Sequence, residues 1–254
     1  MLVSWARGEG RRLVVVGRGS NLLVRDEGTD AIVASTYPRM SHMEPIDDRR
    51  LRAEAGASLG RLAKLALELG LAGLEPVASI PGTVGGGLAM NAGTPEGALG
   101  DVLEKTKVLT ADGEIADLAP EDLELGYRTS AIPARGLVVL EAVFALEPGD
   151  QARMREHMER DLAGRKKATP WGEPSAGSVF KNPPGDAAGR IIEAAGLKGL
   201  TIGGAQVSTR HANFIVNRGG ATASDVLALI DEIRRRVREA SGVELELELK
   251  ILDR

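Results

Sequence analysis

The sequence contains no cysteine and only three histidines among its 254 residues. The absence of cysteine excludes disulfide bonds, thiolate catalysis and zinc sites built from cysteine. His42, His157 and His211 are too few for a zinc site built from histidines, so we expect no metal. None of the three lies in a recognisable position for a catalytic base.

Long hydrophobic runs and a strong net charge are also missing. No apolar segment approaches the length that spans a membrane, and residues 1–12 contain no apolar signal core. We therefore expect a cytoplasmic protein without membrane insertion. The net charge is −4, and no basic face carries interleaved aromatic residues, so nucleic-acid binding is not expected.

Short apolar strands and occasional helices divide the chain. Strands are predicted at residues 13–16, 22–24, 31–34, 51–55 and 137–144, with a hairpin of 107–110 and 115–118 on an Asp-Gly turn. Helices are predicted after Ser58 to residue 69, over roughly 151–167, and from a cap at Ser224 to a stop at Gly242. Residues 243–252 alternate without a break and predict a final strand. Grouped strands with occasional helices indicate an α+β fold.

Two glycine-rich segments follow apolar strands. The first, "GRGSN" (17–21), begins like a dinucleotide fingerprint, but Leu22 stands at the third glycine position and a strand follows instead of a helix. The second, "SIPGTVGGGLAMNAG" (79–93), is expected to be a loop and lacks the Gly-Lys-Ser/Thr of a P-loop. Either segment alone could be an ordinary turn. Two of them together fit one long ligand with a diphosphate, because consecutive backbone amides bind anions.

Three polar side chains are candidates for chemistry. Ser178 is presented in "SAGSVFKNPPG" (175–185), but a serine in a glycine turn commonly bonds a nearby amide, and no Gly-x-Ser-x-Gly pentapeptide supports a hydrolase. Arg128 in "GYRTS" could equally form a surface ion pair. Glu248 shares the polar face of the last predicted strand with Glu244 and Glu246, and solvent alone would explain all three.

The order of "GRGSNLLV", "SIPGTVGGGLAMNAG", "GYRTS", "SAGSVFKNP" and "LELELKIL" resembles the UDP-N-acetylenolpyruvoylglucosamine reductase (MurB) family. Members of this family are FAD enzymes of peptidoglycan synthesis, and the resemblance covers nearly the whole chain. The first two segments also resemble the wider vanillyl-alcohol-oxidase (PCMH) type of flavoprotein fold. Arg128 and Ser178 are spaced as in the short, type II form. The chain departs from the family at Arg18, where glycine or asparagine is more usual. Family members usually carry a further N-terminal segment before the first loop, and either this sequence starts late or that segment is absent.

The resemblance implies the domain organisation and the reaction. Residues 1–148 would form a two-subdomain FAD-binding module, and residues 149–254 an α+β substrate domain whose last strand, about 243–252, returns to the flavin site. The implied activity is reduction of UDP-N-acetylglucosamine enolpyruvate to UDP-N-acetylmuramate, with FAD and NADPH as cofactors. The UDP-sugar is the expected partner, and a monomer is favoured.

The resemblance also assigns roles to residues. Arg128 would meet the substrate carboxylate, and Glu248 would help to polarise the enolic intermediate. Ser178 would donate a proton to the α-carbon after hydride addition to the β-carbon, which needs no activating base because the intermediate is itself basic. The residues implied to hold FAD are Gly17, Gly19, Ser20, Asn21, Leu22, Pro81, Gly82, Gly85, Gly86, Asn91, Ala92 and Gly93. The residues implied to contact the substrate are Tyr127, Lys181, Asn182 and Gln206.

Two alternatives stay open at this point. One is a related FAD oxidase that passes electrons to oxygen. The other is a flavin-binding protein whose catalysis is impaired by the short N-terminus.

Overall fold

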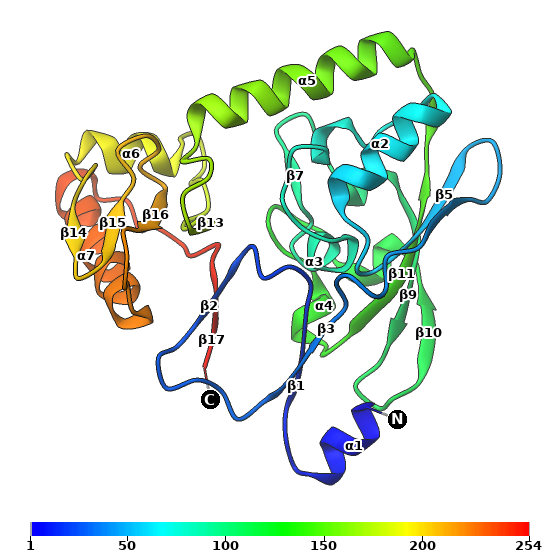
Figure 1. The fold of residues 1–254 in the computed structure, drawn as a ribbon, viewed down its shortest axis with the longest axis horizontal. Helices are drawn as coiled ribbons and strands as arrows, with labels where there is room; N and C mark the ends of the chain where they lie inside the picture. The colour runs from blue at the N-terminus through cyan, green and yellow to red at the C-terminus, as the bar shows by residue number, and fades with distance from the viewer. Residues whose placement is uncertain (1, 254) are drawn as a thin grey trace. The chain divides into compact units, whose positions relative to one another are not determined.

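The computed structural model describes residues 2–253, which divide into two compact units. The first unit contains residues up to 18 together with 31–163, and the second contains residues 19–30 and those from 164 onward. Helices and strands are mixed in both units (Figure 1), which confirms the α+β class. The boundary of the units at residues 163/164 falls inside α5 (Gln151–Ala168). The functional boundary at 148/149 stays a prediction.

A five-stranded antiparallel sheet forms the centre of the first unit, in the order β10-β9-β11-β5-β4. Its strands are β4 (Met43–Pro45), β5 (Arg50–Glu54), β9 (Leu103–Leu109), β10 (Ile115–Leu118) and β11 (Val138–Ala145). The hairpin of β9 and β10 confirms the one predicted on the Asp-Gly turn. Side chains alternate along β5, so Leu51 and Ala53 are buried in a core shared with α2 (Leu59–Leu69) and α3 (Val84–Ala89).

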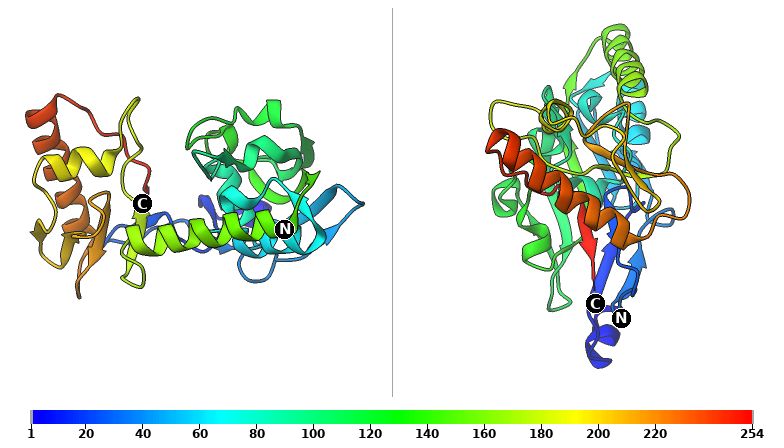
Figure 2. Two further views of the ribbon diagram at one scale, coloured as in Figure 1. Left: turned by 90° about the horizontal axis from the view of Figure 1, so that it is seen from above. Right: turned by 90° about the vertical axis from the view of Figure 1, so that its left-hand side faces the viewer.

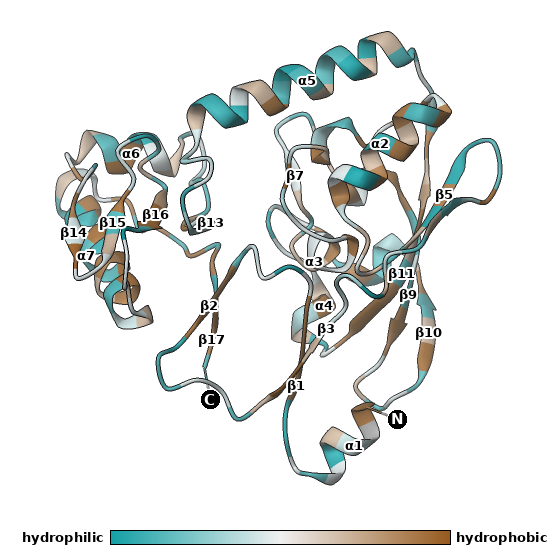
Figure 3. Ribbon diagram, viewed as in Figure 1, coloured by the Kyte–Doolittle hydropathy of each residue, from teal (hydrophilic) through white to brown (hydrophobic). Residues whose placement is uncertain are grey.

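Smaller elements complete the first unit. β1 (Leu13–Val16) pairs in parallel with β3 (Ile32–Ser35). Two further pairs are antiparallel, β6 (Leu71–Ala72) with β12 (Glu147–Pro148) and β7 (Gly93–Thr94) with β8 (Gly97–Ala98). The remaining helices are α1 (Leu2–Gly8), α4 (Ala131–Ala134), η1 (Glu75–Val77), η2 (Leu99–Val102) and η3 (Pro120–Leu123). The helix α5 is hydrophilic over much of its length (Figure 3), and its Met154 is buried.

A four-stranded antiparallel sheet, in the order β13-β16-β15-β14, forms the second unit with two helices (Figure 2). The elements are β13 (Ser175–Ser178), α6 (Ala188–Ala194), β14 (Thr201–Ile202), β15 (Ala205–Val207), β16 (Phe214–Asn217) and α7 (Ala223–Ser241). Ala205, Val207 and Ile215 lie in the core with both helices. Because neighbouring strand residues face opposite ways, Gln206 and Val216 belong to the other face of the sheet.

The C-terminal segment is mostly not a strand, so the prediction for residues 243–252 is wrong in extent. Only β17 (Lys250–Leu252) is regular, and it pairs in parallel with β2 (Leu22–Val24). Before β17 the chain makes one isolated bridge, Phe180 with Leu247. The alternation of apolar and polar residues in this segment nevertheless predicts which side chains are buried, because Leu245 and Leu249 are in the core while Glu244 and Glu246 are exposed. Within residues 2–253, no helix has the length and apolar character needed to span a bilayer.

Helix ends follow the predicted signals in part. Ser58 occupies the N-cap position of α2 as predicted, but its side chain makes no capping hydrogen bond. Gly70 and Gly242 end α2 and α7 in the left-handed conformation, as expected for C-capping glycines. The N-cap of α7 is Thr222, which forms a capping box with Asp225, so the assignment of Ser224 is wrong. Ser224 instead donates its hydroxyl to Asp26 at 2.6 Å, and hydrogen bonds from Ser224 lower the pKa of the Asp26 carboxyl.

Candidate active site

The two glycine-rich segments meet within the first unit. A Cβ at Gly17 would lie only 2.2 Å from the Thr83 hydroxyl, so the first segment passes directly over the side chain of Thr83. Thr83 itself is buried and caps α3 by accepting a hydrogen bond from the amide of Gly86 at 3.4 Å. The contact requires glycine at position 17 and places backbone from both segments side by side.

The second segment contains a short helix, so its prediction as a loop is wrong over residues 84–89. Helix propensity disfavours three consecutive glycines, but packing overrides it here. A Cβ at Gly87 would lie 2.6 Å from Leu99, and one at Gly85 would lie 3.0 Å from the Ala55 Cβ. Only glycine lets α3 lie this close to its neighbours.

Gly19 and Gly86 differ from these packed glycines. Gly19 has a φ of +66° and no heavy atom within 4 Å of the Cβ position, and Gly86 meets only the Thr83 hydroxyl at 3.4 Å. Both residues are exposed. Of the glycines implied to hold FAD, these two offer open space beside their backbone, which a cofactor diphosphate requires.

Arg128 lies in a tight turn that is closed by two backbone hydrogen bonds between Gly126 and Thr129. The amide of Gly126 donates to Thr129 at 3.1 Å and the amide of Thr129 donates back at 3.3 Å. Arg128 adopts a φ of +55°, a left-handed conformation that is costly for a residue with a side chain. Such local strain is concentrated at functional sites.

Three hydrogen bonds attach this turn to the second glycine segment. Arg128 Nη2 donates to the Gly93 carbonyl at 2.8 Å, Asn91 Nδ2 donates to Gly126 at 3.1 Å, and Ser130 Oγ donates to Ala89 at 2.9 Å. Ser130 belongs to the motif "GYRTS", but the sequence did not indicate that its side chain would attach this turn to the second glycine segment. Asn91 also accepts from Gly100 at 3.0 Å, so its side chain holds the segment together, and its assignment to FAD stays a prediction.

Ser178 ends β13 in the second unit and is partly exposed. It follows Gly177, whose φ is +81°, and pairs with Phe214 across a bulge in the sheet. Paired residues share a face, so Ser178 lies on the face of Gln206, away from the helical core. Its hydroxyl forms no hydrogen bond with any residue between 2 and 253. The serine is therefore presented, as its sequence context suggests.

Asn213, which sequence reasoning missed, fixes the segment that carries Ser178. Its buried amide accepts from the Phe180 N–H at 2.9 Å and donates to the Phe180 carbonyl at 2.8 Å. Its own backbone N–H donates to His211 Nδ1 at 3.2 Å. Burial lowers the pKa of His211, and the positive charge of Lys198 acts in the same direction. A neutral ring is required, because a protonated Nδ1 could not accept.

Glu248 lies beside the Ser178 segment and the first glycine segment. The Val179 carbonyl accepts from the amide of Glu248 at 2.9 Å, so Ser178 is one residue from a direct backbone contact with Glu248. Asn21 Nδ2 donates to the Glu248 carbonyl at 3.1 Å, and the Asn21 carbonyl accepts from Lys250 at 3.1 Å. Glu248 is partly buried, whereas Glu244 and Glu246 are exposed. The three glutamates are thus not equivalent.

The implied substrate residues have protein partners of their own. Lys181 Nζ lies 2.5 Å from Glu246 Oε1, and Asn182 Oδ1 accepts from the amide of Ala188 at 3.0 Å at the start of α6. Tyr127 is exposed in the first unit, and its ring lies 5.2 Å from the Arg128 guanidinium.

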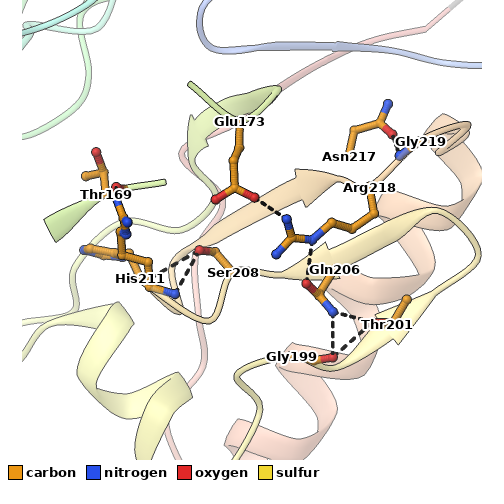
Figure 4. Close-up of polar contacts among 11 residues, drawn as sticks. Thr169, Glu173, Gly199, Thr201, Gln206, Ser208, His211, Asn217, Arg218 and Gly219 are labelled. Carbon is orange, nitrogen blue, oxygen red and sulfur yellow. Dashed lines mark hydrogen bonds and ion pairs between the residues drawn. The ribbon is translucent and has the colours of Figure 1, made fainter. Parts of the chain in front are cut away.

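Gln206 is held in a polar chain on the open face of the second sheet (Figure 4). Arg218 Nε donates to Gln206 Oε1 at 2.7 Å, and Gln206 Nε2 donates to Thr201 at 3.0 Å. The other side of the Arg218 guanidinium pairs with Glu173. Arg218 and Glu173 were not among the predicted residues, and the sequence offers no signal for them beyond their charge.

Two family models match the chain. The model described as FAD binding domain matches residues 1–119, and the model described as UDP-N-acetylenolpyruvoylglucosamine reductase, C-terminal domain, matches residues 169–252.

Proteins similar over nearly the whole chain share one name. The UDP-N-acetylenolpyruvoylglucosamine reductase of Geobacillus thermodenitrificans is 46% identical over 240 residues, which cover 94% of this chain and 78% of that protein. The one from Heliobacterium modesticaldum is 45% identical over 252 residues, covering 99% and 80%. The crystal structure of UDP-N-acetylenolpyruvylglucosamine reductase from Thermus caldophilus gives a TM-score of 0.84 at 39% identity, over 98% of this chain and 88% of that one. This chain therefore belongs to the UDP-N-acetylenolpyruvoylglucosamine reductase family.

Proposed function

We propose that the protein reduces UDP-N-acetylglucosamine enolpyruvate to UDP-N-acetylmuramate with FAD and NADPH, in peptidoglycan synthesis. Membership of the family supports the reaction class. The observation that carries the assignment of residues is the backbone hydrogen bond from Glu248 to Val179, which brings the partly buried Glu248 next to the segment that carries Ser178. A cytoplasmic location and a monomeric state remain part of the proposal.

The glycine-rich segments of the chain fit FAD. Gly86 in the second segment and Gly19 in the first leave open space beside their backbone that a Cβ would fill, while Gly17, Gly85 and Gly93 pack closely against neighbouring residues. Ser20, Asn21 and Leu22 continue the first segment into β2, and Pro81 and Gly82 lead into Thr83. When bound, FAD supplies a hydride carrier between NADPH and the enolpyruvyl group.

Arg128 would bind the substrate carboxylate. A guanidinium carries five N–H donors in a planar fork that suits the two oxygens of a carboxylate, and the bond of Nη2 to the Gly93 carbonyl helps to fix its position. Negative charge grows on that carboxylate as the double bond is reduced, and a fixed cation stabilises it. The left-handed turn at residues 126–129 would thus hold a preformed positive charge for the substrate carboxylate.

Ser178 would deliver the proton and Glu248 would polarise the enolic oxygen. The hydroxyl of Ser178 needs no general base because the intermediate is basic enough to take its proton. Glu248 would carry out its task best when protonated, since a carboxylate would repel the growing negative charge. Asn213 keeps Ser178 in place through the two hydrogen bonds to Phe180.

The sugar and diphosphate would bind along the second unit. Lys181 would exchange the exposed Glu246 for a substrate phosphate, which an ammonium binds as a point charge. Gln206 would contact the sugar with its amide oriented by Arg218, and Asn182 would do so near the start of α6. Tyr127 would cover the substrate next to Arg128.

Stopped-flow absorbance of the flavin tests the proposal. NADPH reduces the protein without oxygen, and the enolpyruvyl substrate is then added. Ser178→Ala should be reduced by NADPH at nearly the normal rate, but its reoxidation by substrate should fall by roughly 10²–10⁴-fold, the usual effect of losing a positioned acid. Ser178→Cys should retain part of the activity because a thiol also donates a proton.

The same measurement separates the alternatives. A purified protein that cannot take up FAD would rule out both enzyme readings. Reduced flavin that reacts fast with air and slowly with the enolpyruvyl substrate would mark an oxidase. If Ser178→Ala reoxidises as fast as the parent, the proton has another source, although the overall reaction could still be correct.

A further inference from the structure

Three side chains with metal-binding atoms converge in the first unit, on residues to which no role has been assigned above. His157 and Asp161 are one helical turn apart on α5, and Glu96 lies in the turn between β7 and β8. His157 Nε2 is 3.2 Å from Asp161 Oδ2 and also contacts Glu96 Oε2. One ligand atom from each of the three side chains lies within 4.8 Å of the other two.

The imidazole nitrogen at the centre of this cluster completes no hydrogen bond. His157 Nε2 has essentially no exposed surface, and it makes no hydrogen bond with any described residue although both carboxylates lie within ion-pair distance of it. Buried polar atoms are nearly always paired, so an orphan of this kind calls for an explanation such as an unseen ion. The lone pair of a neutral imidazole is a good metal ligand.

The second oxygen of each carboxylate is held from outside the cluster. Arg160 lies 4.0 Å from Glu96 Oε1 and 3.7 Å from Asp161 Oδ1, while the other oxygen of each carboxylate faces His157. Partners of this kind orient the ligands of metal sites. The positive charge of Arg160 opposes a nearby cation, so we expect weaker affinity than three such ligands would give alone.

We propose that Glu96, His157 and Asp161 form a binding site for a divalent transition-metal ion, with zinc the best match. One imidazole nitrogen and two carboxylate oxygens are ordinary zinc ligands, and water would complete the tetrahedron. Magnesium and calcium prefer sites made of oxygen alone. The two negative carboxylates balance the double positive charge of the ion. His157 would then bind the ion as a neutral ligand.

Such an ion would join α5 to the hairpin that helps to hold Arg128. Glu96 follows β7, which begins at Gly93, and the Gly93 carbonyl accepts the hydrogen bond from Arg128. Met154 of the same helix is buried, and Met158 packs on the core of the first unit. Bound zinc would therefore stabilise the first unit around the hairpin.

Zinc titration of the full-length protein without a histidine tag tests the proposal. Calorimetry should show one equivalent bound to the parent, and cobalt in place of zinc should give visible absorption bands typical of a tetrahedral site. His157→Gln and Asp161→Asn should each weaken zinc binding at least tenfold. His42→Gln is the matched control, because His42 is exposed and also lies beside a carboxylate, Glu44, at 3.2 Å, and it should bind zinc like the parent.

Thermal unfolding provides a second readout. Added zinc should raise the melting temperature of the parent and of His42→Gln, because a ligand that binds the folded state stabilises it, and should leave His157→Gln unchanged. If His157→Gln does not fold, Glu96→Gln on the exposed hairpin takes its place in both assays. The absence of zinc binding to the parent, or binding that survives both Glu96→Gln and Asp161→Asn, overturns the proposal and leaves an ion-pair cluster.

Discussion

The individual glycines of the two glycine-rich segments are required for different physical reasons. Gly17, Gly85 and Gly87 are glycine because another part of the first unit occupies the space of a side chain. Gly19 needs its positive φ. Gly86 has neither a positive φ nor a close packing contact that would require glycine. The sequence identified the segments but could not sort these roles, because a packing contact with Thr83 or Ala55 depends on residues that are distant in the chain.

Gly86→Val should release FAD without unfolding the protein. The new Cβ has only the Thr83 hydroxyl within 4 Å, at 3.4 Å, so the fold should accept it while the bound cofactor should not. Flavin content after purification, with the melting temperature of the apoprotein, measures both effects. Gly164→Val on α5, where nothing lies within 4 Å, is the control and should keep its flavin.

Gly85, next to Gly86, should respond differently to the same substitution. Gly85→Val should lower the melting temperature, because its Cβ would lie 3.0 Å from the Ala55 Cβ and 3.2 Å from the Ala55 carbonyl. Full flavin content in a well-folded Gly86→Val would show that the cofactor does not approach this backbone.

Glu248 should be distinguishable from the other glutamates of its segment. Glu248→Gln removes a carboxyl that is partly buried beside the Ser178 segment, and we expect reoxidation of the flavin by substrate to slow by about 10²–10³-fold, the usual loss for an electrostatic group. Glu244→Gln should be nearly silent, because Glu244 is exposed and pairs with Arg238 at 2.8 Å. Single-turnover kinetics provides the comparison, and equal effects at both positions would contradict the role of Glu248.

Secondary-structure elements were predicted best where their signals are local. Strand β1, the β9–β10 hairpin and helices α2 and α5 follow from apolar runs, turn residues and caps. The last strand was over-extended because alternating burial also arises in a chain that passes over a core without pairing. Helix α3 was missed because its glycines serve packing, and the true cap of α7, Thr222, lies two residues before Ser224.

The arch of residues 211–214 shows why part of the site could not be read from the sequence. The pairing of β13 with β16 brings residues 211–214 next to the Ser178 segment, although the two are distant in the sequence. The Asn213 side chain replaces two backbone bonds of the sheet at Phe180. Its chemistry is common to many turns, so nothing local marks it.

Stability should depend on pH through His211. Burial holds its pKa below the ordinary value of 6.5, so as pH falls the unfolded chain takes up a proton before the folded protein does. The unfolded state then binds more protons, and the free energy of unfolding decreases as pH falls below about 6.5. Above that pH the ring is neutral in both states, and its contribution is constant.

Urea denaturation of the parent and of His211→Gln at several pH values between 8 and 5 measures this effect. The difference in unfolding free energy between the two proteins should be constant above pH 6.5 and should shrink below it, because only the parent then loses stability through this ring. Curves that stay parallel over the whole range would show that His211 is not held neutral.

At the scale of the whole molecule, the predicted catalytic residues are distributed over both units. Arg128 belongs to the first unit, whereas Ser178 and Glu248 belong to the second. Each unit has its own hydrophobic core. The chain leaves the first unit between Arg18 and Gly19, inside the first glycine segment. The ordered motifs of the sequence were sufficient to recognise both parts, but not that residues 19–30 would join the second unit, because that depends on the long-range pairing of β2 with β17.

If the two units act on one substrate, the effects of Arg128→Ala and Ser178→Ala should not be independent. Both residues are proposed to serve the same enolic intermediate, and residues that act as a unit lose less together than the product of their separate losses. Each single variant and the double variant are reduced with NADPH, and the rate of reoxidation by substrate is measured in a single turnover. We expect normal reduction by NADPH in all three and a double variant only slightly slower than the slower single variant. A double variant whose loss equals the product of the two single losses would mean that Arg128 and Ser178 act at separate steps, and the assignment of Arg128 to the carboxylate of the intermediate would then fail.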